Sequence, residues 1–199
     1  GALPIKPNGV AGVSLTASPF SLFDSLSQLA PSINTVYVLY SNSSKWIIPE
    51  AEQQAKQAGL NLVPIAVNDL RDAVKQYEQI FGRENIQNSA IWLPLDSVTA
   101  HEKVVVPTIL EKAWNQKLVV FSSKPIHAKR GALFSAMPHN KSMGEQLARM
   151  LNSFDKNQTP SDVKPMKKIK LAVNLRTAAH LGLSYDNNQK SNFDITFPK

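Results

Sequence analysis

Polar side chains suited to holding a small ligand gather in the segments that follow the apolar stretches of this chain. They supply hydroxyl, amide, carboxylate and ammonium groups, together with one indole ring. A few such groups on an otherwise apolar wall fix a small polar molecule by hydrogen bonds and one stacking face. We therefore predict a ligand-binding role for Ser41, Asn42, Ser44, Trp46, Asp96, Ser97, Ser123, Lys124 and His139.

Catalytic and metal-binding patterns are poorly represented. The chain has no Cys, and its four His residues lack metal-ligand spacing such as HExxH. Ser123, His139 and Asp96 could be combined into a Ser-His-Asp set, but any chain of this size offers one. No GxSxG turn accompanies them. We expect no enzyme activity, no metal and no cofactor.

Nucleotide signatures are also missing, because neither GxGxxG nor GxxxxGK[ST] occurs. The SNSSKW segment at 41–46 precedes a predicted helix, and helix N-terminal amides can hold a phosphate. It lacks the glycines that allow close backbone approach. A flavodoxin-like enzyme acting on a phosphate ester is therefore kept as an alternative.

Short apolar runs alternate with amphipathic stretches along the chain. Strands are predicted at 35–40, 61–67, 89–95, 118–123, 131–137 and 168–173, and Phe193, Ile195 and Phe197 alternate as a further edge strand. The alternation is typical of βαβ units in an α/β fold with a doubly wound parallel sheet. We predict the order 2-1-3-4-5, counting from the strand at 35–40, with ligand-binding loops at the carboxyl edge.

Helix boundaries are marked by capping residues. Ser18 before Pro19 predicts a helix start, and Asp69 predicts another that ends before Gly82. Thr99 and Glu102 have the spacing of a capping box for a helix that runs to Gln116. Further helices are predicted at 48–58, 141–152 and 175–181.

The composition of the chain bears on whether it binds nucleic acid or spans a membrane. The net charge is +7, but the basic residues are scattered and do not alternate with aromatic ones, so nucleic acid is not expected. No apolar run is long enough to span a bilayer, and no secretory signal is visible. The opening GALPIKPNGVAG resembles a Pro/Gly-rich connector, and we expect the chain to begin within a longer gene product.

Two C-terminal stretches, KRGALFSAMPHNKSMGEQLARMLN and VKPMKKIKLAVNLRTAAHLGLSY, carry a family resemblance. The first contains Arg130-Gly131-Ala132 and a helix with Gly144, and the second contains Val173–Ala178 and a Leu-Gly-Leu close. The spacer that joins them is marked by Pro160 and Pro165. The N-terminal GVAGVSLTASPFSLFDSLSQLAPSINTVYVLYSNSS fits the same pattern. Together they resemble the ABC transporter substrate-binding proteins that include tryptophan- and tyrosine-type receptors, with a type I periplasmic-binding-protein fold.

The resemblance implies a two-lobed protein of which this chain holds mainly the second lobe. Residues 1–18 would be a hinge or connector, and 19–140 the α/β ligand-binding lobe. Residues 141–165 would be a return helix and connector toward the first lobe, and 166–199 a final strand, short helix and tail packed on the lobe.

The same resemblance implies a function. Members of the family are periplasmic or extracytoplasmic components of ABC importers. They capture a small molecule in an interlobe cleft without catalysis and present it to a membrane permease. A stand-alone ligand-sensing or interaction module is the second alternative. The family often carries acids after its fourth and fifth strands, where this chain has Ser123-Lys124 and His139, which favours a neutral or anionic ligand.

Overall fold

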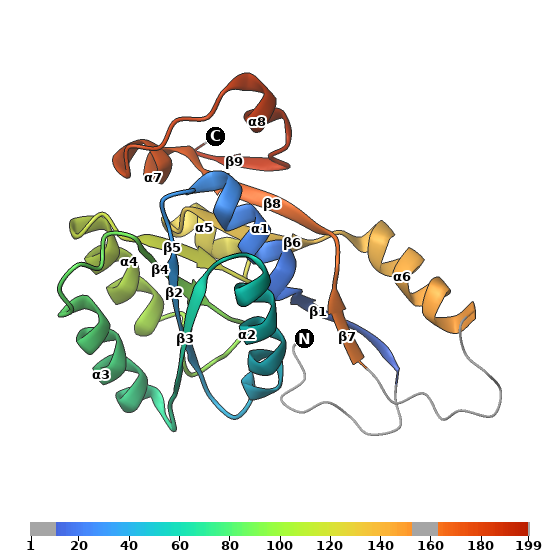
Figure 1. Ribbon diagram of the computed structural model, residues 1–199, viewed down its shortest axis with the longest axis horizontal. Coiled ribbons are helices and arrows are strands. Elements are labelled where there is room, and N and C mark those ends of the chain that lie inside the picture. Colours follow the sequence, from blue (N-terminus) through green and yellow to red (C-terminus); the bar gives the residue numbers. More distant parts are fainter. Residues whose placement is uncertain (1–10, 153–162, 199) are drawn as a thin grey trace.

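A seven-stranded sheet forms the centre of the computed structural model, which describes residues 11–152 and 163–198 (Figure 1). Across the sheet the strands are β3 (Asn61–Ala66), β2 (Thr35–Tyr40), β4 (Ser89–Leu93), β5 (Val119–Ser122), β6 (Phe134–Pro138), β8 (Ile169–Asn174) and β9 (Ile195–Phe197). Neighbouring strands are parallel except β6 and β8, which run antiparallel. The predicted doubly wound sheet and its 2-1-3-4-5 order are confirmed, and the predicted edge strand is β9.

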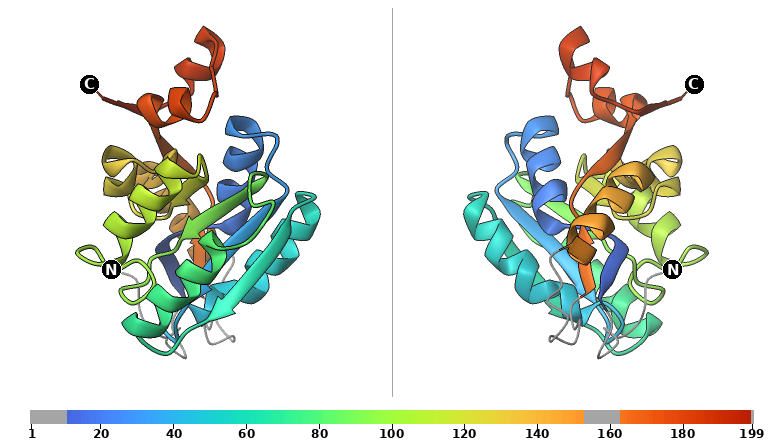
Figure 2. Two further views of the ribbon diagram at one scale, coloured as in Figure 1. Left: turned by 90° about the vertical axis from the view of Figure 1, so that its left-hand side faces the viewer. Right: turned by 90° about the vertical axis from the view of Figure 1, so that its right-hand side faces the viewer.

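Helices cover both faces of the sheet. The helices α1 (Pro19–Leu29) and α2 (Ile48–Gln57), the latter entered through the 3-10 turn η1 (Lys45–Ile47), pack on one face. The helices α3 (Leu70–Phe81) and α4 (Val105–Asn115) pack on the other. Figure 2 shows these two layers on opposite sides of the strands. Because these strands are covered on both faces, successive residues along them are apolar, and the strands could be predicted from the sequence.

Two of the predicted caps are confirmed. The hydroxyl of Ser18 accepts a hydrogen bond from the backbone N–H of Ser21 at 3.3 Å, and Pro19 occupies the first helical position of α1. The carboxylate of Asp69 accepts from the N–H of Asp72 at 2.8 Å at the start of α3. Each side chain satisfies a helix N–H that has no partner within its own helix.

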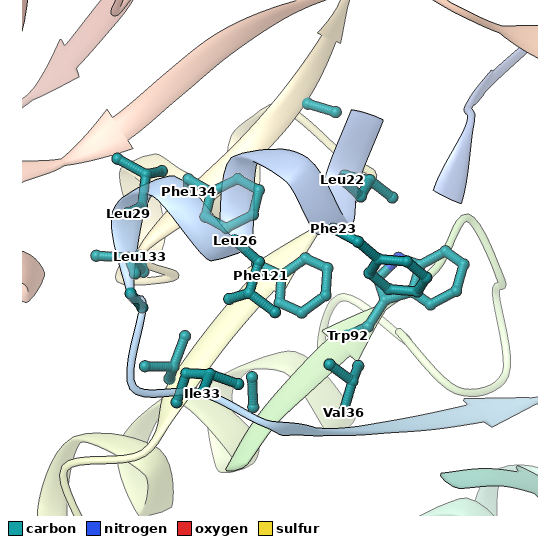
Figure 3. Close-up of a cluster of buried hydrophobic side chains, with 14 of the residues drawn as sticks. Leu22, Phe23, Leu26, Leu29, Ile33, Val36, Trp92, Phe121, Leu133 and Phe134 are labelled. Carbon is teal, nitrogen blue, oxygen red and sulfur yellow. The ribbon is translucent and has the colours of Figure 1, made fainter. Parts of the chain in front are cut away.

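Aromatic rings fill the layer between α1 and the sheet (Figure 3). The ring of Phe23 meets the indole of Trp92 edge-on, with 5.8 Å between ring centroids. The rings of Phe121 and Phe134 stack on neighbouring strands at 5.1 Å. All four side chains are fully buried, so this layer holds α1 firmly against the strands that carry the loops at the carboxyl edge.

A separate two-stranded parallel sheet joins β1 (Gly12–Ala17) to β7 (Val163–Met166). The helix α6 (Asn140–Asn152) extends away from the main sheet on the same side as this pair (Figure 1). Leu147 and Leu151 of α6 are exposed. The end of the predicted connector, from Val163, forms β7, in which Val163 and Pro165 are buried. Residues 1–10 of the predicted hinge and 153–162 of the predicted connector lie outside the described residues.

The C-terminal segment packs on the main domain through specific contacts. Its short helices are α7 (Leu175–His180) and α8 (Asn187–Ser191). The hydroxyl of Tyr185 donates to the carbonyl of Leu29 at 3.0 Å. The ring of His180 stacks on that of Trp114, with 3.6 Å between centroids. Because β8 and β9 also extend the sheet, this segment is part of the domain and not a loose tail.

We expect Phe23→Ala to lower the free energy of unfolding by about 3–5 kcal/mol, because it removes a fully buried ring from the layer beneath α1. Phe20→Ala on the same helix is the matched control, since Phe20 is 57% exposed. Its effect should stay within about 0.5 kcal/mol. Urea denaturation followed by tryptophan fluorescence measures both. Equal losses would contradict the assigned packing of α1.

Candidate ligand-binding cleft

A cleft of about 670 Å³ opens at the carboxyl ends of β4, β5 and β6. Four of the predicted site residues lie together in its wall: Asp96, Ser97, Ser123 and Lys124. The other lining residues are Leu15, Pro94, Leu95, Ala100, His101, Glu102, Lys103, Pro125 and Pro138. Parallel strands deliver their following loops to one edge, which is where open α/β sheets bind ligands.

The carboxylate of Asp96 ties two of these loops together. Its Oδ2 accepts hydrogen bonds from the backbone N–H of Ser41 at 2.9 Å, the Ser41 hydroxyl at 2.7 Å and the Ser44 hydroxyl at 2.5 Å. Its Oδ1 accepts from the N–H of Val98 at 2.8 Å and of Thr99 at 3.1 Å. Five donors therefore surround one buried carboxylate, joining the loop after β2 to the loop after β4.

These donors keep Asp96 ionised. Burial alone raises the pKa of a carboxyl, because it disfavours the charged form. Hydrogen bonds from Ser44 and Ser41, and from the N–H of Val98, outweigh burial and hold the pKa of Asp96 below its ordinary value. Ser41 and Ser44 thus lie behind the cleft wall and support it.

Ser123 links the cleft to the hydrophobic core. Its hydroxyl oxygen accepts the indole N–H of the buried Trp92 at 2.9 Å. The hydroxyl hydrogen is left to donate, because a serine hydroxyl combines one donor with two acceptor lone pairs. Ser123 therefore offers a positioned hydrogen-bond donor at the end of β5.

Glu102 gathers three basic side chains at the rim. Its carboxylate pairs with the ammonium of Lys124, the guanidinium of Arg130 and, at 3.0 Å, the Nε2 of His127. Burial raises the pKa of Glu102, but the hydrogen bonds and charges of Lys124 and His127 outweigh it and lower the pKa to about 2. The loop before α4 is thereby fastened to the helix α5 (Ile126–Arg130).

His127 also hydrogen bonds to Ser122, with 2.7 Å between Nδ1 and Oγ, which completes a Ser-His-Glu arrangement. Burial lowers the pKa of His127 and outweighs the opposing effect of Glu102, so the ring is neutral and Nδ1 accepts from the serine hydroxyl. Ser122 is fully buried, and its oxygen also accepts the N–H of Lys124 at 3.0 Å. These contacts fix the turn after β5.

Five predicted site residues do not line the cleft. Ser41 and Ser44 bind Asp96, and Asn42 is exposed on the same loop. Trp46 is half-buried and packs against the hydrophobic core that lies beneath α1 and α2. The Nδ1 of His139 accepts the N–H of Ser142 at 3.2 Å, which places its ring at the start of α6. Ligand contacts by these five stay predictions.

The apolar part of the wall was missed from the sequence. Pro94, Pro125 and Pro138 stand at or just after the ends of β4, β5 and β6, and a proline after each strand was the available signal. Leu15 comes from β1, which is distant in sequence from the other lining residues, so no local pattern indicated it.

The predicted capping box at Thr99 and Glu102 is wrong. The helix α4 begins only at Val105, and the hydroxyl of Thr99 is buried without a hydrogen-bond partner among the described residues. Asp96 instead takes the backbone N–H of Thr99, and Glu102 turns to its basic partners. Tertiary contacts therefore override the local spacing here.

Among the described residues, no group of three or more acidic or histidine side chains could hold a metal ion. Within 11–152 and 163–198, none of the helices has the length and apolar character needed to cross a membrane.

Comparison with known proteins identifies the family. A family model described as ABC transporter substrate binding protein matches residues 6–192. The chain belongs to this family. The resemblance noted in the sequence is therefore confirmed. A search of curated protein sequences finds no significant match.

Three solved structures share the fold at low sequence identity. The first is an ABC domain in complex with L-Trp from Streptococcus pneumoniae, with 21% identity and a TM-score of 0.70. The second is a conserved domain protein from Vibrio cholerae, with 19% identity and a TM-score of 0.69. The third is the ligand-free, open form of a substrate binding protein with adhesive properties from Clostridium difficile, with 20% identity and a TM-score of 0.64.

The extent of these matches is uneven. The alignments cover 98%, 94% and 98% of this chain, but only 67%, 62% and 66% of the three longer chains. The substrate-binding family and its type I periplasmic-binding-protein fold are thus shown, and the chain spans about two thirds of the length of the structures it matches.

We expect Asp96→Ala to cost about 3 kcal/mol of stability, because it leaves several buried donors without an acceptor. Asp24→Ala is the control, since Asp24 is exposed and accepts a hydrogen bond from the amide of Gln28 on its own helix. That change should cost about 0.5 kcal/mol or less. Chemical denaturation compares the two. Equal stability of the variants would show that Asp96 does not hold the loops together.

The neutral, buried His127 predicts a pH dependence of stability. Because its folded pKa lies below the ordinary 6.5, the unfolded chain binds the proton first as pH falls. The free energy of unfolding should therefore decrease from about pH 7 to about pH 5. The contribution of Glu102, whose pKa is about 2, is lost only at more acid pH.

Denaturation at several pH values measures this slope. His127→Gln should flatten it, whereas His139→Gln at the start of α6 should leave it unchanged. An unchanged slope in the His127 variant would contradict the assignment.

Proposed function

We propose that this protein is the solute-binding component of an ABC importer, acting outside the cytoplasm. It captures a small molecule in the cleft at the ends of β4, β5 and β6 and presents it to a membrane permease. The observation that carries the proposal is the cleft itself, which has about 670 Å³ of space at the carboxyl edge of the sheet in a chain of this family.

Closure of two lobes is the proposed mechanism of capture. The chain spans about two thirds of the structures it matches, and β1, β7 and α6 lie outside the main sheet. In this proposal 19–140 form the ligand-binding lobe, on which 166–199 pack. Residues 1–18 and 141–165 lead to a second lobe. Leu15 of β1 lines the cleft, so movement of this connecting sheet would change the cleft's shape.

Capture requires no covalent chemistry in this proposal. The arrangement most like a catalytic one is Ser122, His127 and Glu102, and its serine is buried and fully hydrogen bonded. The phosphate-ester alternative has lost its support, since Ser41 and Ser44 of the SNSSKW loop direct their hydroxyls at the carboxylate of Asp96. A carboxylate at that point repels a phosphate.

The proposed ligand site is tested by a substitution that places a large side chain in the cleft. Ser97 is exposed and lines the cleft, so Ser97→Trp should occupy the space without disturbing the core. Asn42→Trp is the matched control, because Asn42 is exposed on a neighbouring loop outside the cleft. The full chain is titrated with amino acids, sugars, organic acids and nucleosides while its amide resonances are recorded by NMR.

We expect at least one solute to shift resonances in the segments 95–103 and 123–124. Ser97→Trp should weaken that binding by about tenfold or more, equivalent to at least 1.4 kcal/mol, and Asn42→Trp should not. Loss of binding in the Asn42 variant alone would place the site on the loop after β2. Absence of binding by every solute would overturn the proposed function.

A measurement of solute uptake by cells distinguishes a role in import from a role in ligand sensing. Cells that carry the permease, its ATPase and this protein should accumulate the labelled solute, and deletion of this protein's gene should abolish accumulation. Unchanged uptake in the deletion strain would favour a ligand-sensing module.

A further inference from the structure

The described wall of the cleft contains two carboxylates, Asp96 and Glu102, and both are already occupied. Asp96 already accepts five hydrogen bonds, which use both of its oxygens. Glu102 already pairs with Lys124, His127 and Arg130. A ligand ammonium would therefore meet no free carboxylate among the described residues of this wall, and an unpaired charge removed from water is strongly disfavoured.

Hydrogen-bond donors, by contrast, are available. The hydroxyl of Ser123 accepts the indole N–H of Trp92 and donates no hydrogen bond to a described residue, so its hydrogen is free to donate to a ligand. Lys103 is exposed in the cleft wall and forms no ion pair with a described residue. These groups suit a ligand oxygen that accepts hydrogen bonds, and a charged donor–acceptor pair is stronger than a neutral one.

The charged side chains that line the cleft are two acids, Asp96 and Glu102, and two bases, Lys103 and Lys124. Lys124 is paired with Glu102, so Lys103 is the base left without an ion pair to a described residue. The remaining wall is apolar and includes Leu15, Leu95 and the prolines at the strand ends. Such a wall takes up hydrocarbon through burial of apolar surface.

We propose that the ligand is a small carboxylic acid with an apolar body and without an amino group. This proposal rests on the proposed function, since it assigns the ligand class of the same cleft. The carboxylate is held by Lys103 and the Ser123 hydroxyl, and the hydrocarbon lies against Leu15 and the prolines. Amino acids and amines are rejected because neither Asp96 nor Glu102 is free to pair with their ammonium group.

Two series of compounds with matched bodies test the ligand class. The aromatic series is 3-phenylpropionate, 3-phenylpropanamide, phenylalanine and 2-phenylethylamine. The aliphatic series is 4-methylvalerate, 4-methylvaleramide, leucine and 3-methylbutylamine. The full chain is titrated with each compound, and its affinity is taken from the NMR shifts of residues 95–103.

In at least one series the acid should bind most tightly and the amide more weakly. The amino acid and the amine should bind at least about tenfold more weakly than the acid. Lys103→Met should weaken binding of the acid by about five- to tenfold and leave the amide unchanged. Lys56→Met is the charge-matched control, because Lys56 lies in the last turn of α2, at the edge where the parallel strands begin. It should change neither.

The outcomes distinguish this proposal from the proposed function. Tighter binding of an amino acid or amine than of its matched acid overturns the ligand class and leaves solute capture intact. Failure of both acids to bind, while a sugar or nucleoside from the wider library shifts the cleft resonances, does the same. Equal weakening of acid and amide by Lys103→Met overturns the role given to Lys103.

Discussion

The buried carboxylate of Asp96 is the interaction on which the ligand-binding edge depends. It lies at the topological switch point of the sheet, between β2 and β4. The chain passes from β2 to β3 on one side of this point and from β4 to β5 on the other. Loops diverge at such a point and leave a crevice, which open α/β sheets commonly use for ligands. Here Asp96 fills the crevice and binds both loops. The open space is consequently shifted to the ends of β4, β5 and β6.

A second polar network fixes the other side of the cleft. Glu102 joins the loop before α4 to Lys124 and Arg130, while His127 connects Glu102 to Ser122 at the end of β5. The carboxylates of Asp96 and Glu102 are therefore both bound by groups of the protein itself. A wall whose side chains are already held in place binds with a smaller loss of conformational entropy.

The hydrophobic core contributes directly to the cleft. Trp92 packs against Phe23 and Phe121 in the interior, and its indole N–H fixes the hydroxyl of Ser123 in the cleft wall. The orientation of this one donor therefore depends on how well α1 packs on the sheet. Stability of the core and geometry of the cleft are linked through a single side chain.

The sequence by itself determined the elements whose signals are local. Buried parallel strands read as apolar runs, and Ser18 and Asp69 marked their helices, so the fold class and strand order followed from the chain. It also placed Asp96, Ser97, Ser123 and Lys124 at one edge. Only the tertiary structure decided that Asp96 and Glu102 are occupied, that Trp46 packs against the core and that Leu15 joins the wall. Those outcomes depend on contacts between residues far apart in sequence, which spacing along one segment does not encode.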